Sequence, residues 1–93
     1  MEYVLRGPSD IAKEIAKREK KIRKRKGYTQ IRLAELCNVS YGTIKKFEQT
    51  GQISLQSLIK IAMELGITDQ MDALFSGVAY TSIQEVIRDA EST

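Results

Sequence analysis

The amino-acid sequence predicts an all-α fold. Its apolar residues recur at the spacing of a helix face, and each such run lies between a residue type that starts helices and one that ends them. No stretch alternates as a strand does, and there is no internal repeat or low-complexity segment. A chain of 93 residues, 42% of them hydrophobic and 29% charged, suits one small soluble domain.

The first helix is expected at residues 9–26, because Pro-Ser-Asp at residues 8–10 is a start signal and Gly27 a stop signal. Three isoleucines share one face of this helix and are expected to point inward: Ile11, Ile15 and Ile22. The other faces carry nine basic residues, namely Lys13, Lys17, Arg18, Lys20, Lys21, Arg23, Lys24, Arg25 and Lys26. Some of these should meet phosphate or acidic side chains.

Thr29 is a good N-cap for a second helix of two turns, which would end at Asn38, a residue that tolerates the left-handed conformation. The expected inward residues are Leu33, Ala34 and Cys37. Because its position is small and buried, core packing is favoured over a redox role for the Cys37 thiol.

After a minimal turn, Ser40 can cap a third helix at residues 40–49, and Gly51 marks its exit. Ile44 and Phe47 would face inward at i, i+3. Two short helices joined by so few residues form a helix-turn-helix.

Ser54 is expected to cap a fourth helix, which Gly66 closes. Its predicted inward face holds Leu55, Leu58, Ile59, Ala62 and Leu65. A short fifth helix would begin at Thr68 or Asp69. It would present Met71, Leu74 and Phe75, more apolar bulk than so small a core requires. We interpret these three residues as a dimer interface, with ordinary core packing as the alternative.

Ser-x-x-Glu at residues 82–85 is a capping-box pattern in front of Val86 and Ile87, and it predicts a short acidic sixth helix. Residues 78–80 are too few to classify. The expected organisation is an N-terminal arm at residues 1–8, a helix-turn-helix domain at 9–76 and a C-terminal extension at 77–93.

The net charge of +3 is unevenly distributed. Residues 6–60 carry 14 basic and 5 acidic side chains, whereas residues 61–93 carry 1 basic and 6 acidic ones. This asymmetry indicates a basic part that meets a polyanion and an acidic part with another task. A solvated charged helix is the plain alternative.

The residue inventory argues against an enzyme. There is no histidine, and the single cysteine allows neither an internal disulfide nor the spacing of a metal site. With no Gly-rich phosphate loop either, no cofactor or metal is expected. The lone thiol suits a cytoplasmic location, and the absence of any long apolar run argues against a membrane-spanning segment.

The segments around the predicted turn carry a recognisable pattern, because Ala34 suits a close helix crossing and Asn38 a turn with positive φ. This pattern resembles the Xre or phage-repressor (Cro-like) helix-turn-helix family over about residues 11–75, through Thr29-Gln30-x-x-Leu33-Ala34, Asn38-Val39-Ser40 and Ile44-x-x-Phe47-Glu48. The resemblance implies a five-helix repressor-type bundle, followed here by a short helical extension. It also implies that the third helix enters the major groove of double-stranded DNA, usually as a two-fold dimer on a palindromic operator.

With Ile44 and Phe47 turned inward, the third helix presents a polar face. The residues predicted to read bases are Ser40, Tyr41, Gly42, Thr43, Lys45 and Lys46. Lys46 suits guanine O6 and N7, and Thr43 suits a thymine methyl group. Gly42 stands where relatives often carry a reading side chain, so it should contribute little direct readout. A solvated face is the alternative for the two lysines.

Five residues are predicted to contact DNA phosphate: Gln30, Arg32, Gln49, Thr50 and Gln52. Gln30 occupies the position of the family's phosphate-binding glutamine, and a helix N-terminus suits an anion. An ordinary surface glutamine is the alternative. The last three residues belong to the loop after the third helix, where family members place polar groups on phosphate.

Glu48 lies on the inner side of the third helix, and a partly buried carboxylate requires a partner. The resemblance implies a structural ion pair between Arg23 and Glu48, with a solvent-exposed Glu48 as the alternative. Glu19 departs from the family pattern, which tends to have an apolar residue there. We therefore expect the first helix to be shifted or bent locally.

Three functional hypotheses follow. The first is a sequence-specific regulator that represses as a homodimer by covering its operator. The second is an antitoxin that binds both DNA and a protein toxin, because residues 47–58 and 80–86 resemble small Xre-type proteins that accompany HipA-type kinase toxins. A dimer-packing helix is the alternative for that tail. The third, binding of RNA or a membrane surface by the basic first helix, is disfavoured because no aromatic residue interrupts the basic run.

Overall fold

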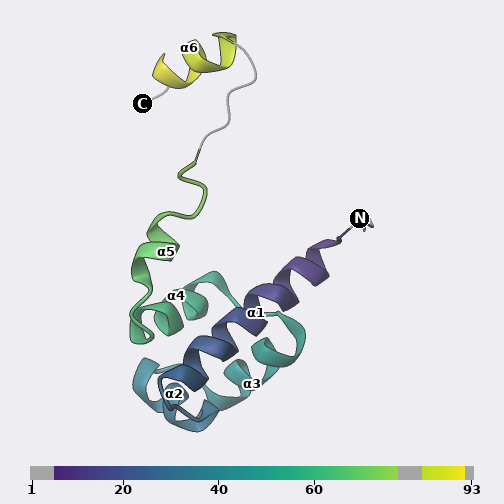
Figure 1. The fold of residues 1–93 in the computed structure, drawn as a ribbon, viewed down its shortest axis with the longest axis vertical. Helices are drawn as coiled ribbons and strands as arrows, with labels where there is room; N and C mark the ends of the chain where they lie inside the picture. The colour runs from purple at the N-terminus through teal and green to yellow at the C-terminus, as the bar shows by residue number, and fades with distance from the viewer. Residues whose placement is uncertain (1–5, 78–82, 92–93) are drawn as a thin grey trace.

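The computed structural model describes residues 6–77 and 83–91, and in the last helix it describes side chains only from residue 87 onward. The helices are α1 (Pro8–Arg25), α2 (Gln30–Cys37), α3 (Tyr41–Thr50), α4 (Leu55–Glu64), α5 (Thr68–Asp72) and α6 (Ile83–Glu91). The described residues contain no strand, which confirms the all-α prediction. Helices α1–α5 form one bundle, and α6 stands apart from it (Figure 1).

The predicted helix boundaries are close to those observed. α1 begins one residue early, since Gly7 rather than the Pro-Ser-Asp run provides the N-cap and accepts backbone hydrogen bonds from the first turn. The Asp10 carboxylate completes this start by accepting a 3.0 Å hydrogen bond from the Gly7 N–H. Arg23, Lys24 and Arg25 occupy the last turn, where positive charge complements the helix dipole.

The predicted inward face of α1 is wrong. Ile11 and Ile15 are 45% and 40% exposed, whereas Ala16 is buried. The buried stripe consists of Ala16, Glu19 and Arg23, and it continues toward Ala12 at i, i+4, i+7 spacing. Among the three isoleucines that were expected inward, Ile22 alone packs on the core.

The helix-turn-helix forms as predicted because its caps are local. The Thr29 hydroxyl accepts a 3.0 Å hydrogen bond from the Arg32 N–H. Asn38 ends α2 with a φ of 57°, the left-handed conformation that Asn tolerates. Ser40 then starts α3 by accepting a 3.1 Å hydrogen bond from the Thr43 N–H.

The core lies where α2 meets α3 and α4. Its buried residues are Leu33, Ala34, Cys37, Val39, Ile44, Ile61 and Leu65. Phe47 is 1% exposed as well, so both predicted inward residues of α3 are confirmed. Burial raises the pKa of the Cys37 thiol, as expected for a packing residue.

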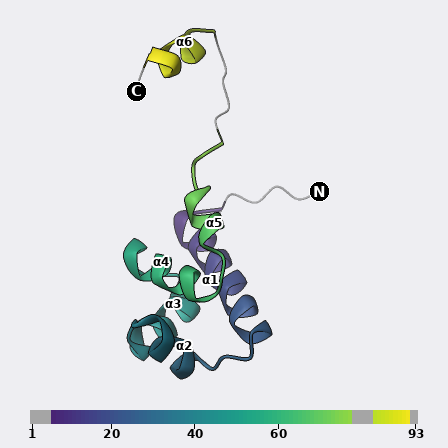
Figure 2. The same ribbon diagram turned by 90° about the vertical axis from the view of Figure 1, so that its left-hand side faces the viewer.

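The predicted inward face of α4 is partly wrong. Ser54 does cap the helix, accepting a 3.1 Å hydrogen bond from the Ser57 N–H. Leu55, however, is 60% exposed because it occupies the first turn, beyond the contact with α2, and Ile61 is buried in its place. The short α5 follows α4 on the side that faces the viewer in Figure 2. Ser82, the predicted cap of α6, lies outside the described residues.

Gly51 sets the distance between α3 and α1. It ends α3 with a φ of 80°, and a Cβ atom built on it would lie 2.6 Å from the backbone carbonyl carbon of Ala12. The backbones therefore touch at this point, and α1 can pack on α3 only through small residues such as Ala12 and Ala16. This contact explains why the bulky isoleucines of α1 lie to the side of the crossing.

We expect Gly51→Ala to lower the free energy of unfolding by about 2 kcal/mol or more, since it combines a strained φ with a clash against rigid backbone. Urea denaturation measures the loss. Gly27→Ala is the matched control, because Gly27 has a φ of 79° but no atom within 4 Å of the added Cβ. Equal losses in the two variants would contradict the close approach.

Candidate nucleic-acid interface

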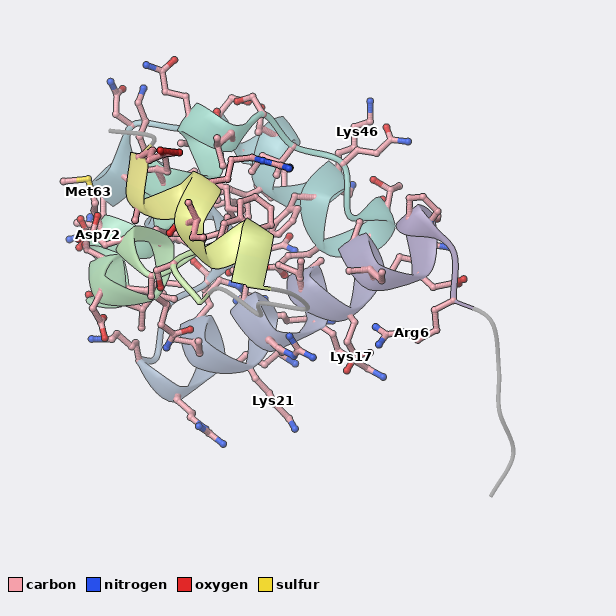
Figure 3. The ribbon with its side chains drawn as sticks, turned by 90° about the horizontal axis from the view of Figure 1, so that it is seen from above. Arg6, Lys17, Lys21, Lys46, Met63 and Asp72 are labelled. Carbon is pink, nitrogen blue, oxygen red and sulfur yellow. The ribbon has the colours of Figure 1, made fainter. Side chains whose placement is uncertain are left out.

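The N-terminal half of α3 presents an ordered polar surface. The Ser40 and Thr43 hydroxyl groups share a 2.7 Å hydrogen bond, so both are oriented before any ligand arrives. Tyr41 is 42% exposed, and the Lys45 ammonium lies 5.9 Å from the centre of its ring. Lys46 extends away from the bundle (Figure 3). These side chains form one exposed face opposite Ile44 and Phe47.

Gly42 lies on the same exposed face without any crowding. A Cβ atom there would meet no heavy atom within 4 Å. The packing of this chain therefore does not require a glycine at this position. Its smooth backbone leaves room for an external surface to approach α3.

The predicted phosphate contacts surround this face. Gln49 and Gln52 are exposed, while Thr50 stabilises the loop after α3: its hydroxyl donates a 2.7 Å hydrogen bond to the Lys46 carbonyl and accepts one of 3.1 Å from the Gln52 N–H. Arg32 forms a 3.3 Å ion pair with Glu35, and both side chains are about 60% exposed. Such a pair contributes little to stability, so Arg32 can exchange it for phosphate.

The predicted ion pair between Arg23 and Glu48 is confirmed. The Arg23 Nε donates to Glu48 Oε2 at 2.8 Å, and Nη2 donates to Oε1 at 2.9 Å. Both side chains are buried, at 7% and 2% exposed. Arg23 Nη1 also donates a 2.7 Å hydrogen bond to the Tyr28 carbonyl oxygen, which ties down the loop between α1 and α2.

Gln30 takes part in the same cluster. Its Nε2 donates a 2.9 Å hydrogen bond to Glu48 Oε1, so the side chain is half-buried against α3 rather than projecting freely. Burial alone would raise the pKa of Glu48, but the hydrogen bonds from Arg23 and Gln30 outweigh it and hold that pKa below its ordinary value. Sequence reasoning assigned Gln30 to phosphate and missed this contact, which only the packing of α2 on α3 creates.

Glu19 does not bend the first helix, contrary to expectation, since α1 is helical without interruption from Pro8 to Arg25. The residue is instead 5% exposed, and neither carboxyl oxygen has a hydrogen-bond donor within reach in the described structure. Burial, followed by contact with the Glu48 carboxylate, raises the pKa of Glu19 to about 8. The group is therefore protonated at neutral pH and can donate its proton to Glu48.

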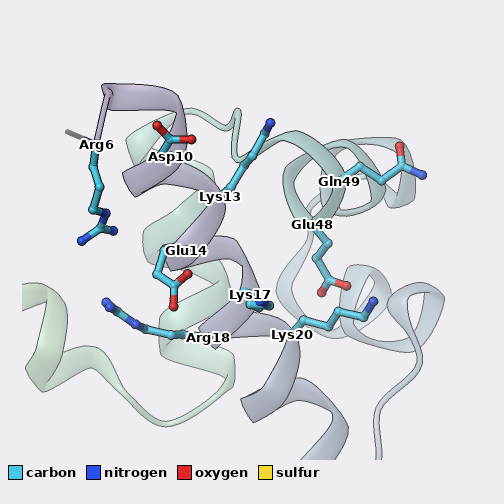
Figure 4. Close-up of a pocket in the computed structure, with 9 residues that line it drawn as sticks. All are labelled: Arg6, Asp10, Lys13, Glu14, Lys17, Arg18, Lys20, Glu48 and Gln49. Carbon is cyan, nitrogen blue, oxygen red and sulfur yellow. The ribbon is translucent and has the colours of Figure 1, made fainter. Parts of the chain in front are cut away.

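A polar groove of about 540 Å³ lies between α1 and the end of α3 (Figure 4). It is lined by Arg6, Asp10, Lys13, Glu14, Lys17, Arg18, Lys20, Glu48 and Gln49. Figure 4 shows Lys13 and Lys20 on the side of α1 that faces α3, with Glu14 and Arg18 on the other side. The basic run announced such contacts, but only the crossing of α1 and α3 selects the lysines that border Gln49.

A family model for the helix-turn-helix matches residues 20–70, from the end of α1 into α5. None of the curated proteins matches the chain. Within the described residues, no helix is long and apolar enough to cross a membrane.

We expect Glu19→Gln to raise the free energy of unfolding at about pH 8 by about 2 kcal/mol. The unfolded chain releases the Glu19 proton near its ordinary pKa of 4.5, whereas the folded chain holds it to about 8. Stability is therefore lost progressively as pH rises from 4.5 to 8. A glutamine amide can donate to Glu48 without that loss. Thermal melts across this range should show a flatter profile for the variant, and identical profiles would contradict the protonated Glu19.

We expect Glu48→Ala to lower the free energy of unfolding by about 3 kcal/mol, because it leaves the Arg23 guanidinium buried without its partner. DNA affinity should fall as well, since α3 loses the contact that sets its tilt. Glu35→Ala removes a carboxylate from an exposed pair and should cost no more than about 1 kcal/mol. Unchanged melting temperature and unchanged affinity in Glu48→Ala would refute the role of the ion pair.

Proposed function

The chain belongs to the helix-turn-helix family, a DNA-binding family of transcription regulation, and from this we propose that it is a repressor that binds a two-fold operator as a homodimer. The observation that carries the proposal is the mounting of α3. Its apolar side is buried, its polar side is exposed, and Arg23 holds its inner carboxylate from α1. Such a helix is suited to enter the major groove as a rigid unit.

We assign base reading to the exposed face at residues 40–46 of α3. Lys46 can donate to guanine O6 and N7, and the Thr43 methyl group can contact thymine. Tyr41 and Lys45 support one another through their ring contact and can reach the flanking base or phosphate. Gly42 then permits the α3 backbone to lie close to the base edges.

We assign phosphate binding to groups around that face. The N-terminus of α2 points its free N–H groups outward, and the second Nε2 proton of Gln30 remains for a phosphate oxygen. Arg32, Gln49, Thr50 and Gln52 supply the remaining predicted contacts, with Lys13 and Lys20 beside them. These contacts would position α3 without reading sequence.

A homodimer through the surface formed by Met71, Leu74 and Phe75 would complete the operator complex. Phe75 is 91% exposed and Leu74 is 52% exposed, while Met71 is half-buried. So much exposed apolar area in a small domain favours burial against a second copy. In that dimer the two α3 helices should lie about 34–36 Å apart, one turn of DNA. Repression would follow from covering the promoter.

The alternative function, an antitoxin, is supported by α6. This acidic helix stands apart from the bundle, and the exposed part of it includes Ile87, 53% accessible (Figure 1). A helix with both charge and apolar surface is suited to bind a partner protein. A chain truncated after Gly77 separates the possibilities. Retained dimerisation and DNA binding, with loss of a co-expressed toxin partner, would support the antitoxin. Loss of the dimer would assign α6 to packing instead.

Operator binding should weaken steeply with salt. If the dimer neutralises about six phosphates, log K should fall against log salt concentration with a slope of about −5. Sequence selection from random duplexes, followed by titration of the selected operator at several salt concentrations, measures both specificity and slope. Binding that ignores salt would contradict the assigned phosphate contacts.

We expect Lys46→Ala to weaken binding to the selected operator by about tenfold and to relax the base preference at one position of each half-site. Lys60→Ala is the charge-matched control, because Lys60 is exposed on α4 rather than on α3. Equal effects of the two variants would show that Lys46 contributes only net charge.

A further inference from the structure

An apolar groove of about 260 Å³ lies between α1, α4 and α5, separate from the DNA-binding face. The walls are mainly aliphatic and include Ile15, Ile22, Leu58, Leu65 and Leu74. This volume is just below the range of about 300–1,000 Å³ typical of pockets for drug-sized ligands. It is suited to a small molecule rather than to a folded partner.

The groove has one buried polar feature, the carboxyl group of Glu19. When protonated, this group can donate to Glu48, but its second oxygen still has no donor in the described structure. A buried acceptor without a donor is costly, and apolar pockets use such groups to orient ligands. The neighbouring wall residues of α4 and α5 carry no charge, and the polar Arg18 and Gln70 are exposed.

The charge balance at this point indicates the chemistry of the missing donor. Two carboxyl groups, Glu19 and Glu48, share one buried guanidinium, that of Arg23, so full ionisation would leave one uncompensated negative charge. A proton supplies the balance in the free protein. A ligand cation at the same place could supply it instead and would add a charge-assisted hydrogen bond.

We infer that this groove binds a small primary amine with an apolar body, its ammonium group paired with Glu19 and its hydrocarbon part packed against the isoleucine and leucine walls. Binding transfers the Glu19 proton to solvent and forms an ion pair, with no change in covalent bonds. An alcohol of the same shape fills the groove but cannot balance the charge, and an anion would meet two carboxyl groups.

The site adjoins the proposed dimer surface, because Met71 and Leu74 line its outer part. Amine binding does not depend on the proposed function, since it can be measured without DNA. A bound amine would alter the shape of that surface and so give the regulator a means to sense a small molecule.

Isothermal titration of the full chain with cyclohexylmethylamine and with cyclohexylmethanol, at about neutral pH, tests the inference. We expect the amine to bind about tenfold more tightly than the alcohol, with release of a proton detected in buffers of different ionisation enthalpy. Amide signals of Ile22, Leu58 and Leu74 should shift in the NMR spectrum of the complex.

Glu19→Gln should abolish the preference for the amine, because it keeps the shape of the neutral side chain but cannot become an anion. Glu35→Gln, which removes an exposed carboxylate on α2, should retain it. The inference is overturned if amine and alcohol bind equally, if Glu19→Gln keeps the preference, or if neither compound binds because a second copy covers the groove.

Discussion

The paired hydrogen bonds between Arg23 and Glu48 hold α3 in place. α3 has ten residues, and its two buried apolar side chains alone leave its rotation on α1 loosely defined. Two hydrogen bonds from one planar guanidinium fix that rotation, because both bonds need the same orientation of the carboxylate. Arg23 also binds the Tyr28 carbonyl oxygen and Gln30 binds Glu48, so α1, α2 and α3 meet at one carboxylate.

This arrangement places a second carboxyl group, Glu19, in the same interior. Ionised, it would set like charges side by side in a region shielded from water; protonated, it is tolerated at neutral pH. The cluster thus joins two surfaces of the molecule. On one side it fixes the helix that faces DNA, and on the other side Glu19 lines an apolar groove. Changes in charge within the groove would act on the contact that orients α3.

The success of the sequence predictions differs between elements for a physical reason. Thr29, Ser40 and Ser54 all cap helices as expected, because a cap bonds a backbone N–H only a few residues away. The inward face of α1 was mispredicted, since hydrophobic spacing ignores how closely a neighbouring helix approaches. At the crossing, Gly51 brings the backbone of α3 against Ala12, and isoleucines have no room there.

By itself the sequence determined the helices, their caps, the outward polar face of α3 and the concentration of positive charge before residue 60, because all of these follow from interactions over a few residues or from composition. The pairing of Arg23 with Glu48 was accessible only through family resemblance. Tertiary structure alone decided that Gln30 bonds to Glu48, that Glu19 is buried beside it, and which lysines of α1 border α3. These features depend on contacts across 18 or more residues, which local propensity and spacing do not encode.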